Sequence, residues 1–336
     1  MTMRAFDYHL RQNASRRFGL PVLFGLVLYM SIVPSTFAAK YAGDPFSLGV
    51  GARALALGGA VVAGPFDGTA AYWNPAGMTQ LSGKYLVAMH AETFGSLLNH
   101  DFVSFTNAGS DSAKLIRAYG FYIYYLGGGG IKITEMGDNE RPYVLREESH
   151  ADMLFAGAVA GRITSKIAYG LTGRIIYRDI ATESGWGLSA DAGLTWQAKS
   201  YATFGLMVTD ITTGFIHYSG KTFGAANTES IYPTVKPGLM LTRHYREFTG
   251  RFLMSGDIKF ESIKNEAQYW TGPLSLDMHY GLEVGYRDML FGRVGFDIGR
   301  FTTGVGLNIR NLTFDFAYLH SDQLDETFRI SAGFRF

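Results

Sequence analysis

Apolar residues occupy every second position over most of the chain between residues 276 and 336. In residues 276–287, for example, Leu, Met, Tyr, Leu, Val and Tyr alternate with Asp, His, Gly, Glu, Gly and Arg. A period of two residues is typical of a β-strand with one apolar and one polar face. The pattern predicts strands at 276–287, 290–298, 301–310, 312–318 and 327–336.

Weaker alternation continues toward the N-terminus. It predicts nine further strands, at 84–91, 99–107, 115–126, 151–162, 166–179, 186–198, 201–209, 233–244 and 247–260. Segments of about 9–11 residues with alternating faces are the signature of a transmembrane β-barrel, and bacterial single-chain barrels have even strand numbers. The sequence therefore predicts an all-β fold, an antiparallel transmembrane barrel of about 14 strands over residues 84–336.

The connections between these strands are of two lengths. The four predicted strands between 276 and 318 are joined by turns of one or two residues, whereas 127–148, 213–231 and 262–273 are longer and more polar. We predict that these three segments are external loops. Alternation of short turns and long loops along the chain is typical of outer-membrane barrels.

Composition favours the same fold. Charged residues make up 18% of the 336-residue chain, compared with about a quarter in soluble proteins, while glycines number 42 and aromatics reach 15%. The absence of cysteine excludes disulfides and thiolate metal sites. The formal net charge of +1 gives no reason to expect a nucleic-acid partner, which needs a basic surface.

Residues 1–38 have the order of a secretory signal peptide. Arg16 and Arg17 precede an apolar run, Phe18–Val33, and small residues follow, with Ala38 before the expected cleavage point. An uncleaved membrane anchor is the alternative, but the run is shorter than the roughly 20 residues of a spanning helix. We therefore expect export to the bacterial outer membrane, where lipid and the barrel-assembly machinery are the first partners.

Residues 39–83 do not alternate, and they predict a small helical plug inside the barrel or at its mouth. The segment contains GARALALGGA at 51–60 and DGTAAYWNPAGM at 67–78. These two motifs resemble the N-terminal signature of PorV/PorQ-type outer-membrane proteins. Those proteins are similar in turn to the FadL long-chain fatty-acid transporters, whose N-terminal hatch also carries an Asn-Pro-Ala element.

The resemblance assigns residues to two plug elements. Gly51, Ala52 and Arg53 match the first element, and Asn74, Pro75, Ala76 and Gly77 match the second. We expect a structural role in closing the lumen, with gating of a passage as the functional alternative. A cation in a lumen needs an acidic partner, and four inward carboxylates are candidates for Arg53: Asp277, Glu283, Asp297 and Asp315.

Strand alternation also predicts which charged side chains face the lumen. Charges cost little there, whereas Arg or Lys facing lipid costs roughly 2–4 kcal/mol at the bilayer midplane. The predicted lumen residues are Asp277, His279, Glu283, Arg293, Asp297, Arg310, Asp315, Arg329 and Arg335. The aromatic pair Phe334 and Phe336 at the end of the last strand resembles the signal that the barrel-assembly machinery reads.

We find no sequence motif for catalysis. The eight histidines lack metal-ligand spacing such as H-E-x-x-H, and there is no G-x-S-x-G elbow. We therefore expect no catalytic residue, no metal, no cofactor and no enzymatic activity, although dispersed catalytic residues are an alternative.

Two functions remain open on the sequence. The first is a PorV/PorQ-like accessory role in protein secretion of type IX, with a secretion translocon and exported proteins as partners. In that case the loops 127–148 and 213–231 are the expected contact surfaces. The second is a FadL-like channel for uptake of hydrophobic small molecules, in which the plug and a lateral strand defect would matter.

Overall fold

The computed structural model describes residues 43–93, 97–109, 115–137, 140–181, 183–219, 227–261, 264, 267–320 and 326–336. The predicted signal peptide, residues 1–38, lies outside the described residues. Within the described part, short helical pieces come first and strands follow from Gly83 onward.

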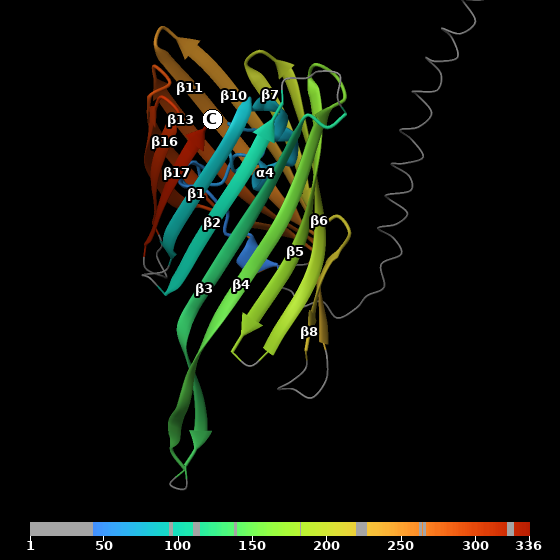
Figure 1. The fold of residues 1–336 in the computed structure, drawn as a ribbon, viewed down its shortest axis with the longest axis vertical. Coiled ribbons are helices and arrows are strands. Elements are labelled where there is room, and N and C mark those ends of the chain that lie inside the picture. Colours follow the sequence, from blue (N-terminus) through green and yellow to red (C-terminus); the bar gives the residue numbers. More distant parts are fainter. Residues whose placement is uncertain are drawn as a thin grey trace, which may run out of the picture. The chain divides into compact units, whose positions relative to one another are not determined.

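Fourteen strands pair in one antiparallel ring (Figure 1). Each strand pairs with the next in the following order, and the last pairs with the first. The ring consists of β1 (Gly83–Thr93), β2 (Leu98–Ala108), β3 (Ala118–Met136), β4 (Pro142–Arg162), β5 (Ile167–Ile180), β6 (Glu183–Lys199), β7 (Ala202–Thr209), β10 (Thr234–Tyr245), β11 (Phe248–Lys259), β13 (Leu274–Tyr286), β14 (Leu290–Asp297), β15 (Arg300–Ile309), β16 (Leu312–Leu319) and β17 (Thr327–Arg335). The predicted fourteen-stranded barrel is confirmed.

The ring closes at β1 and β17, which pair from Tyr85↔Arg335 to Glu92↔Phe328. At the end of this seam Lys84 and Phe336 exchange two backbone hydrogen bonds of 3.0 Å. Closure removes the free strand edges that lipid would leave without hydrogen-bond partners. Among the described residues no helix has the length and apolar character needed to cross a membrane.

Side-chain burial alternates along the strands with the predicted period. In β14 and β16, for example, Val294, Phe296 and Phe314 face outward, while Arg293 and Asp315 are buried in the lumen. The outward side chains are almost all apolar, and many are aromatic. An apolar exterior around a lumen with charged residues is the arrangement expected of a barrel that spans a lipid bilayer.

The two ends of the barrel differ. At the end where Phe336 lies, strands are joined by tight turns such as 246–247 and 287–289. At the opposite end two connections, β7–β10 and β11–β13, are longer and contain three additional short strands: β8 (Gly214–Tyr218), β9 (Asn227–Ile231) and β12 (Tyr269–Thr271). β8 and β9 extend the sheet beside β6, and β12 pairs with β13.

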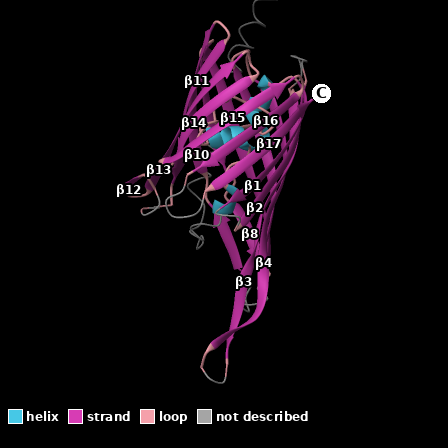
Figure 2. Cartoon of the chain, turned by 90° about the vertical axis from the view of Figure 1, so that its left-hand side faces the viewer, coloured by secondary structure: helices cyan, strands magenta, loops and turns pink. Residues whose placement is uncertain are grey.

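The prediction of a loop at 127–148 is wrong, because β3 and β4 continue through most of that segment. The two strands form a hairpin that extends beyond the rest of the ring (Figures 1 and 2). Their register shifts between Gly128 and Ile131, and Gly130 has φ of +78°. The glycines therefore form an irregularity within a strand, after which Ile131 and Ile133 resume the pairing.

Four short helical pieces lie inside the ring: η1 (Asp44–Phe46), α3 (Ala52–Ala56), α4 (Ala70–Trp73) and η2 (Pro75–Gln80) (Figure 2). Glycine and proline residues at the ends of α3 and η2 have backbone conformations that favour those boundaries. Gly51 precedes α3 with φ of +83°, and Gly58 and Gly59 follow it with positive φ, a conformation that glycine adopts without strain. Pro75 stands at the first position of η2, where its missing N–H is not needed.

Candidate functional site

A buried cluster of charges joins the plug to the barrel wall. Glu283 on β13 is fully buried, and its carboxylate accepts hydrogen bonds from three guanidinium groups. Arg53 of α3 donates from Nε and Nη2 at 3.0 and 2.9 Å, Arg251 of β11 donates at 2.5 Å, and Arg293 of β14 donates at 2.7 Å. Arg293 also donates to Asp315 of β16 at 2.7 Å. We refer to these five residues as the Glu283 cluster.

The Glu283 cluster satisfies the main condition for burying charges, which is that each has partners. Of the four carboxylates proposed for Arg53, the structure pairs it with Glu283. Burial alone would lower the pKa of Arg53, but the Glu283 carboxylate outweighs this effect and raises the pKa above its ordinary value. The plug therefore carries a fixed positive charge that is held by one carboxylate of the wall.

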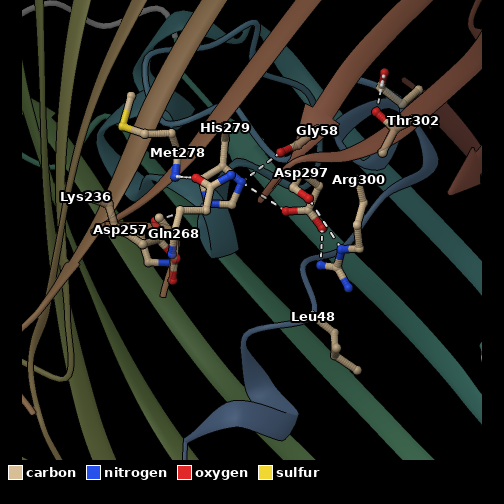
Figure 3. Close-up of polar contacts among 12 residues, drawn as sticks. Leu48, Gly58, Lys236, Asp257, Gln268, Met278, His279, Asp297, Arg300 and Thr302 are labelled. Carbon is tan, nitrogen blue, oxygen red and sulfur yellow. Dashed lines mark hydrogen bonds and ion pairs between the residues drawn. The ribbon is translucent and has the colours of Figure 1, made fainter. Parts of the chain in front are cut away.

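A second polar group lies on the same wall and contacts the segment after α3. Nδ1 of His279 is 2.9 Å from the carbonyl oxygen of Gly58 and 3.0 Å from Oδ1 of Asp297 (Figure 3). Asp297 also pairs with Arg300 at 2.7 Å. Gly58 lies so close to β13 and β14 that a Cβ there would collide with the carbonyl oxygens of Tyr280 and Phe296. Glycine is therefore required for the plug to reach this wall.

The opposite side of the plug is held by close packing. Asn74 is fully buried; its Nδ2 donates to the carbonyls of Val62 and Leu194 at 2.9 and 3.1 Å, and its Oδ1 accepts from Ala76 N at 3.2 Å. The wall beneath is made of glycine: a Cβ at Gly193 would collide with Asn74, and one at Gly170 would collide with Pro75 and Ala76. The other residues of this element, Pro75, Ala76 and Gly77, are also buried.

Aromatic side chains fill the space between α4 and strands β2 and β3. Tyr72 packs against Phe102, Tyr122 and Tyr124, with ring centroids 5.9–6.5 Å apart. The polar ends of the plug aromatics are also bonded: Tyr72 donates to Phe46 O at 2.7 Å, and Trp73 Nε1 donates to Val50 O at 2.9 Å. Aromatic groups with satisfied polar atoms make a rigid wall.

A cavity of about 220 Å³ remains between the plug and the barrel. The plug contributes Phe46, Leu48, Tyr72 and Trp73 to its lining, and strand residues contribute both apolar and charged groups. The lysines and arginines that line it are Arg174, Lys236, Lys259, Arg300 and Arg329. The cavity can therefore hold a small molecule in contact with aromatic rings and with charges.

The wall is irregular where β6 changes partners. β6 pairs with β7 from Ala192 to Lys199 and with β8 from Gly185 to Leu188. Between these two ladders, Ala190 O accepts from Ile211 N at 2.8 Å. Here the barrel exterior carries a groove of about 610 Å³, whose floor includes Gly157 and Gly173.

An ion-pair network lies on the lumen side of this irregularity. Arg174 contacts Asp191 at 2.7 Å and Asp210 at 2.5 Å, and all three side chains are at most a tenth exposed. Asp210 lies in the turn that follows β7, so these pairs attach the turn to β5 and β6. This network was not predicted from the sequence, although Arg174 and Asp191 lie at inward positions of the predicted strands.

The remaining predicted lumen charges are not all in the lumen. Arg310 is exposed in the turn after β15, with φ of +55°, because the strand ends at Ile309 before the alternation reaches it. Arg335 is exposed at the rim, where it donates to Ser82 Oγ at 2.8 Å. Asp277 and Arg329 are buried as predicted. Phe334 and Phe336 are exposed and stacked, with ring centroids 5.5 Å apart.

The described part of the chain contains no group of three or more His, Asp or Glu side chains placed to hold a metal ion. The carboxylates of the Glu283 cluster and of the Arg174 network are instead paired with arginines.

Three comparisons place the fold among known proteins. No protein-family profile matches the chain, and no curated protein matches it. Among solved structures, the Ralstonia pickettii toluene transporter TbuX superposes with a TM-score of 0.56 at 13% identity, over 87% of this chain and 100% of TbuX. The CymD monoaromatic hydrocarbon channel gives 0.56 at 13% identity, over 86% and 98%. The Pseudomonas putida toluene transporter TodX gives 0.52 at 11% identity, over 85% and 96%.

These similarities establish the fold, which is a closed barrel of fourteen antiparallel strands with short N-terminal helical pieces. They do not separate the PorV/PorQ branch from others, so that assignment stays a prediction.

Proposed function

We propose that this protein is an outer-membrane channel through which hydrophobic small molecules pass the plug and enter the cell. The observation that carries the proposal is the cavity of about 220 Å³ between the plug and the wall, with Phe46, Leu48, Tyr72 and Trp73 in its lining. A concave site of aromatic and apolar side chains with a few polar groups is the usual form of a small-molecule site. The structural neighbours named as toluene transporters and a monoaromatic hydrocarbon channel support the same function.

The route we infer has two parts. A molecule enters from the end with long connections and occupies the cavity above the plug. It leaves sideways at the irregularity in β6, where the ladder to β7 ends and the exterior groove begins. Movement of the 210–213 turn, which Arg174 holds through Asp210, would open this exit.

The proposal also assigns the parts of the chain. Residues 1–38 act as a cleaved signal peptide, residues 39–83 form the plug, and residues 84–336 form the barrel. Phe334 and Phe336 serve barrel assembly, and the plug residues Arg53 and Asn74 keep the lumen closed until the plug moves.

Mass spectrometry of the protein purified from its own outer membrane in mild detergent tests this function. We expect the barrel to come out without large protein partners and with a bound lipophile, and expect that lipophile to be lost after exchange into a competing detergent. An isolated barrel that binds neither native lipophiles nor added toluene would contradict the proposal.

One observation favours the second function, an accessory role in secretion. The hairpin formed by β3 and β4 extends beyond the ring and exposes Met136, Tyr143, Val144 and Leu145. Exposed apolar side chains on a projecting element are typical of a protein-binding surface. If this function holds, the same purification will recover a translocon and exported proteins, and deletion of residues 130–146 will release them.

A further inference from the structure

One buried cation in the cavity differs from all the others that line it. Of the five lysines and arginines in the lining, four pair with carboxylates: Arg174 with Asp191 and Asp210, Lys236 with Asp257, Lys259 with Asp44, and Arg300 with Asp297. Arg329 on β17 has no carboxylate within 4.0 Å among the described residues, although it is only 2% exposed.

The contacts of Arg329 leave part of its guanidinium free. Nη1 donates to the carbonyl of Gly49 at 3.0 Å and Nη2 donates to that of Leu48 at 3.3 Å, both in the plug. Nε is buried and has no hydrogen-bond partner. An unpaired buried charge is costly, so a negatively charged group at this place would be strongly favoured.

The neighbours of Arg329 on the adjacent strands are small side chains and unpaired polar groups. Ala317 and Ala91 flank it in register on the adjacent strands, and His100 follows Ala91 in the same row. Both ring nitrogens of His100 and the hydroxyl of Thr93, which lines the cavity, are buried and lack partners. Unsatisfied polar atoms therefore lie on three adjacent strands, and two of the side chains that carry them, Thr93 and Arg329, line the cavity.

The volume of the cavity limits what can bind there. A cavity of roughly 150 Å³ accommodates benzene, so about 220 Å³ fits one ring with a small substituent. Tyr122, Leu48 and Leu319 also line the cavity and offer apolar surface to the ring. Five other carboxylates of the lining, at Asp44, Asp191, Asp210, Asp257 and Asp297, are each paired with a cation, and Asp277 accepts a hydrogen bond from Gln268 N at 2.9 Å.

We propose that the cavity binds a single-ring organic acid, whose carboxylate pairs with Arg329 and whose ring lies between the plug and the wall. The inference rests on the proposed channel function and narrows its substrate from hydrophobic compounds in general to aromatic acids. Arg329 lies under the plug carbonyls of Leu48 and Gly49, so a bound carboxylate would compete with them for the guanidinium.

The test is calorimetric titration of the purified full chain in detergent with benzoate and with toluene. Arg329→Met removes the charge, and Arg310→Met is the matched control, because Arg310 is exposed in a turn. We expect wild type and Arg310→Met to bind benzoate equally, and Arg329→Met to bind it roughly tenfold to a hundredfold more weakly, the loss expected for one charge-assisted hydrogen bond. Toluene binding should be the same in all three proteins, and Arg329→Lys should keep part of the benzoate affinity.

Each other outcome has a definite meaning. If toluene binds but benzoate affinity is equal in wild type and Arg329→Met, the aromatic-acid proposal is wrong and the channel function stands. If neither compound binds to wild type, both proposals fail. If inorganic phosphate displaces benzoate as well as benzoate itself does, the site recognises an anion without the ring, which also overturns the proposal. Should Arg329→Met not fold, benzoate and benzamide are compared on wild type, and equal affinities reject the proposal.

Discussion

The plug is attached to the barrel by different means on its two sides. On the side of β13–β16, α3 and the segment after it are held by the charges of the Glu283 cluster and by His279. On the side of β4–β6, η2 lies directly on the glycine positions Gly170 and Gly193, and Asn74 bonds to backbone carbonyls. Both attachments include close packing, but the first adds a few long charged side chains, whereas the second relies on packing and on contacts with backbone atoms.

This difference indicates where the plug can be released. An ion pair within a cluster can be broken by rotating one side chain, and the remaining cations keep their carboxylate partner. Close backbone packing cannot be relieved so locally, because interiors deform little without a cost over many atoms. We therefore expect the α3 side to open first and the η2 side to act as the hinge.

The largest effect is expected from Glu283→Gln. The substitution keeps the shape of the side chain but leaves Arg53, Arg251 and Arg293 around an uncharged amide. Leaving buried charges unpaired costs about 3–5 kcal/mol. Denaturant unfolding in detergent micelles should show this loss of stability, and single-channel recordings should show a higher conductance because the plug is loosened.

Glu247→Gln is the control for that substitution. Glu247 also pairs with an arginine, Arg287, at 2.7 Å, but both side chains are exposed at a turn. We expect its unfolding midpoint and conductance to match wild type. If Glu283→Gln has the same unfolding midpoint and conductance as Glu247→Gln, the Glu283 cluster does not stabilise the plug, and the proposed difference between its two sides is wrong.

A smaller effect is expected from Gly193→Ala, which tests the packed side. The added methyl group would collide with Asn74, and overpacking of this kind typically costs about 1–3 kcal/mol. Gly173→Ala is a matched control on the adjacent strand, because a Cβ there has nothing within 4 Å. The unfolding midpoint should fall for Gly193→Ala alone; equal midpoints for the two variants would mean that η2 is not in close contact with the wall.

Asn74→Ala should lower the free energy of unfolding by the same amount as Gly193→Ala or by less. The truncation leaves the carbonyls of Val62 and Leu194 and the amide of Ala76 without their side-chain partner, which costs about 1–2 kcal/mol. Asn107→Ala, which removes an exposed amide bonded to Tyr119 at 2.9 Å, should leave the midpoint unchanged. Hydrogen exchange at residues 75–80 distinguishes local loosening of η2, which we expect, from general unfolding.

The sequence was sufficient to predict the strands because each strand repeats one simple constraint. Because each strand has lipid on one side and the lumen on the other, apolar and polar side chains must alternate along it. This alternation can be recognised in the sequence without knowing which strands pair. The error at 127–148 has the same origin. Four successive glycines resemble a loop, but backbone hydrogen bonds between β3 and β4 continue past them, and these bonds do not depend on side-chain type.

The site could be predicted only in part. Alternation places Asp277, Glu283, Asp297 and Asp315 on one face, and therefore could not show which of them reaches Arg53. That choice depends on how deep α3 lies in the lumen, which is fixed by contacts such as that of Gly58 with Phe296. The sequence also could not show that Arg329 lacks a carboxylate partner. That depends on which side chains of other strands and of the plug lie near it in the folded protein.

The smallest effect on stability is expected from Arg53→Met. This substitution is nevertheless the most direct test of whether the α3 side of the plug opens. Glu283 keeps Arg251 and Arg293 as partners, and the desolvation cost of one buried guanidinium is recovered, so the net loss should be about 1 kcal/mol. Arg251→Met is the matched control, because Arg251 contacts the same oxygen with nearly the same exposure, 18% compared with 16%, but belongs to the wall. Hydrogen exchange at residues 52–58 should accelerate in Arg53→Met and stay at the wild-type rate in Arg251→Met. Equal rates in the two variants would show that the Arg53–Glu283 pair does not hold the plug closed, and that α3 is retained by packing like the rest of the plug.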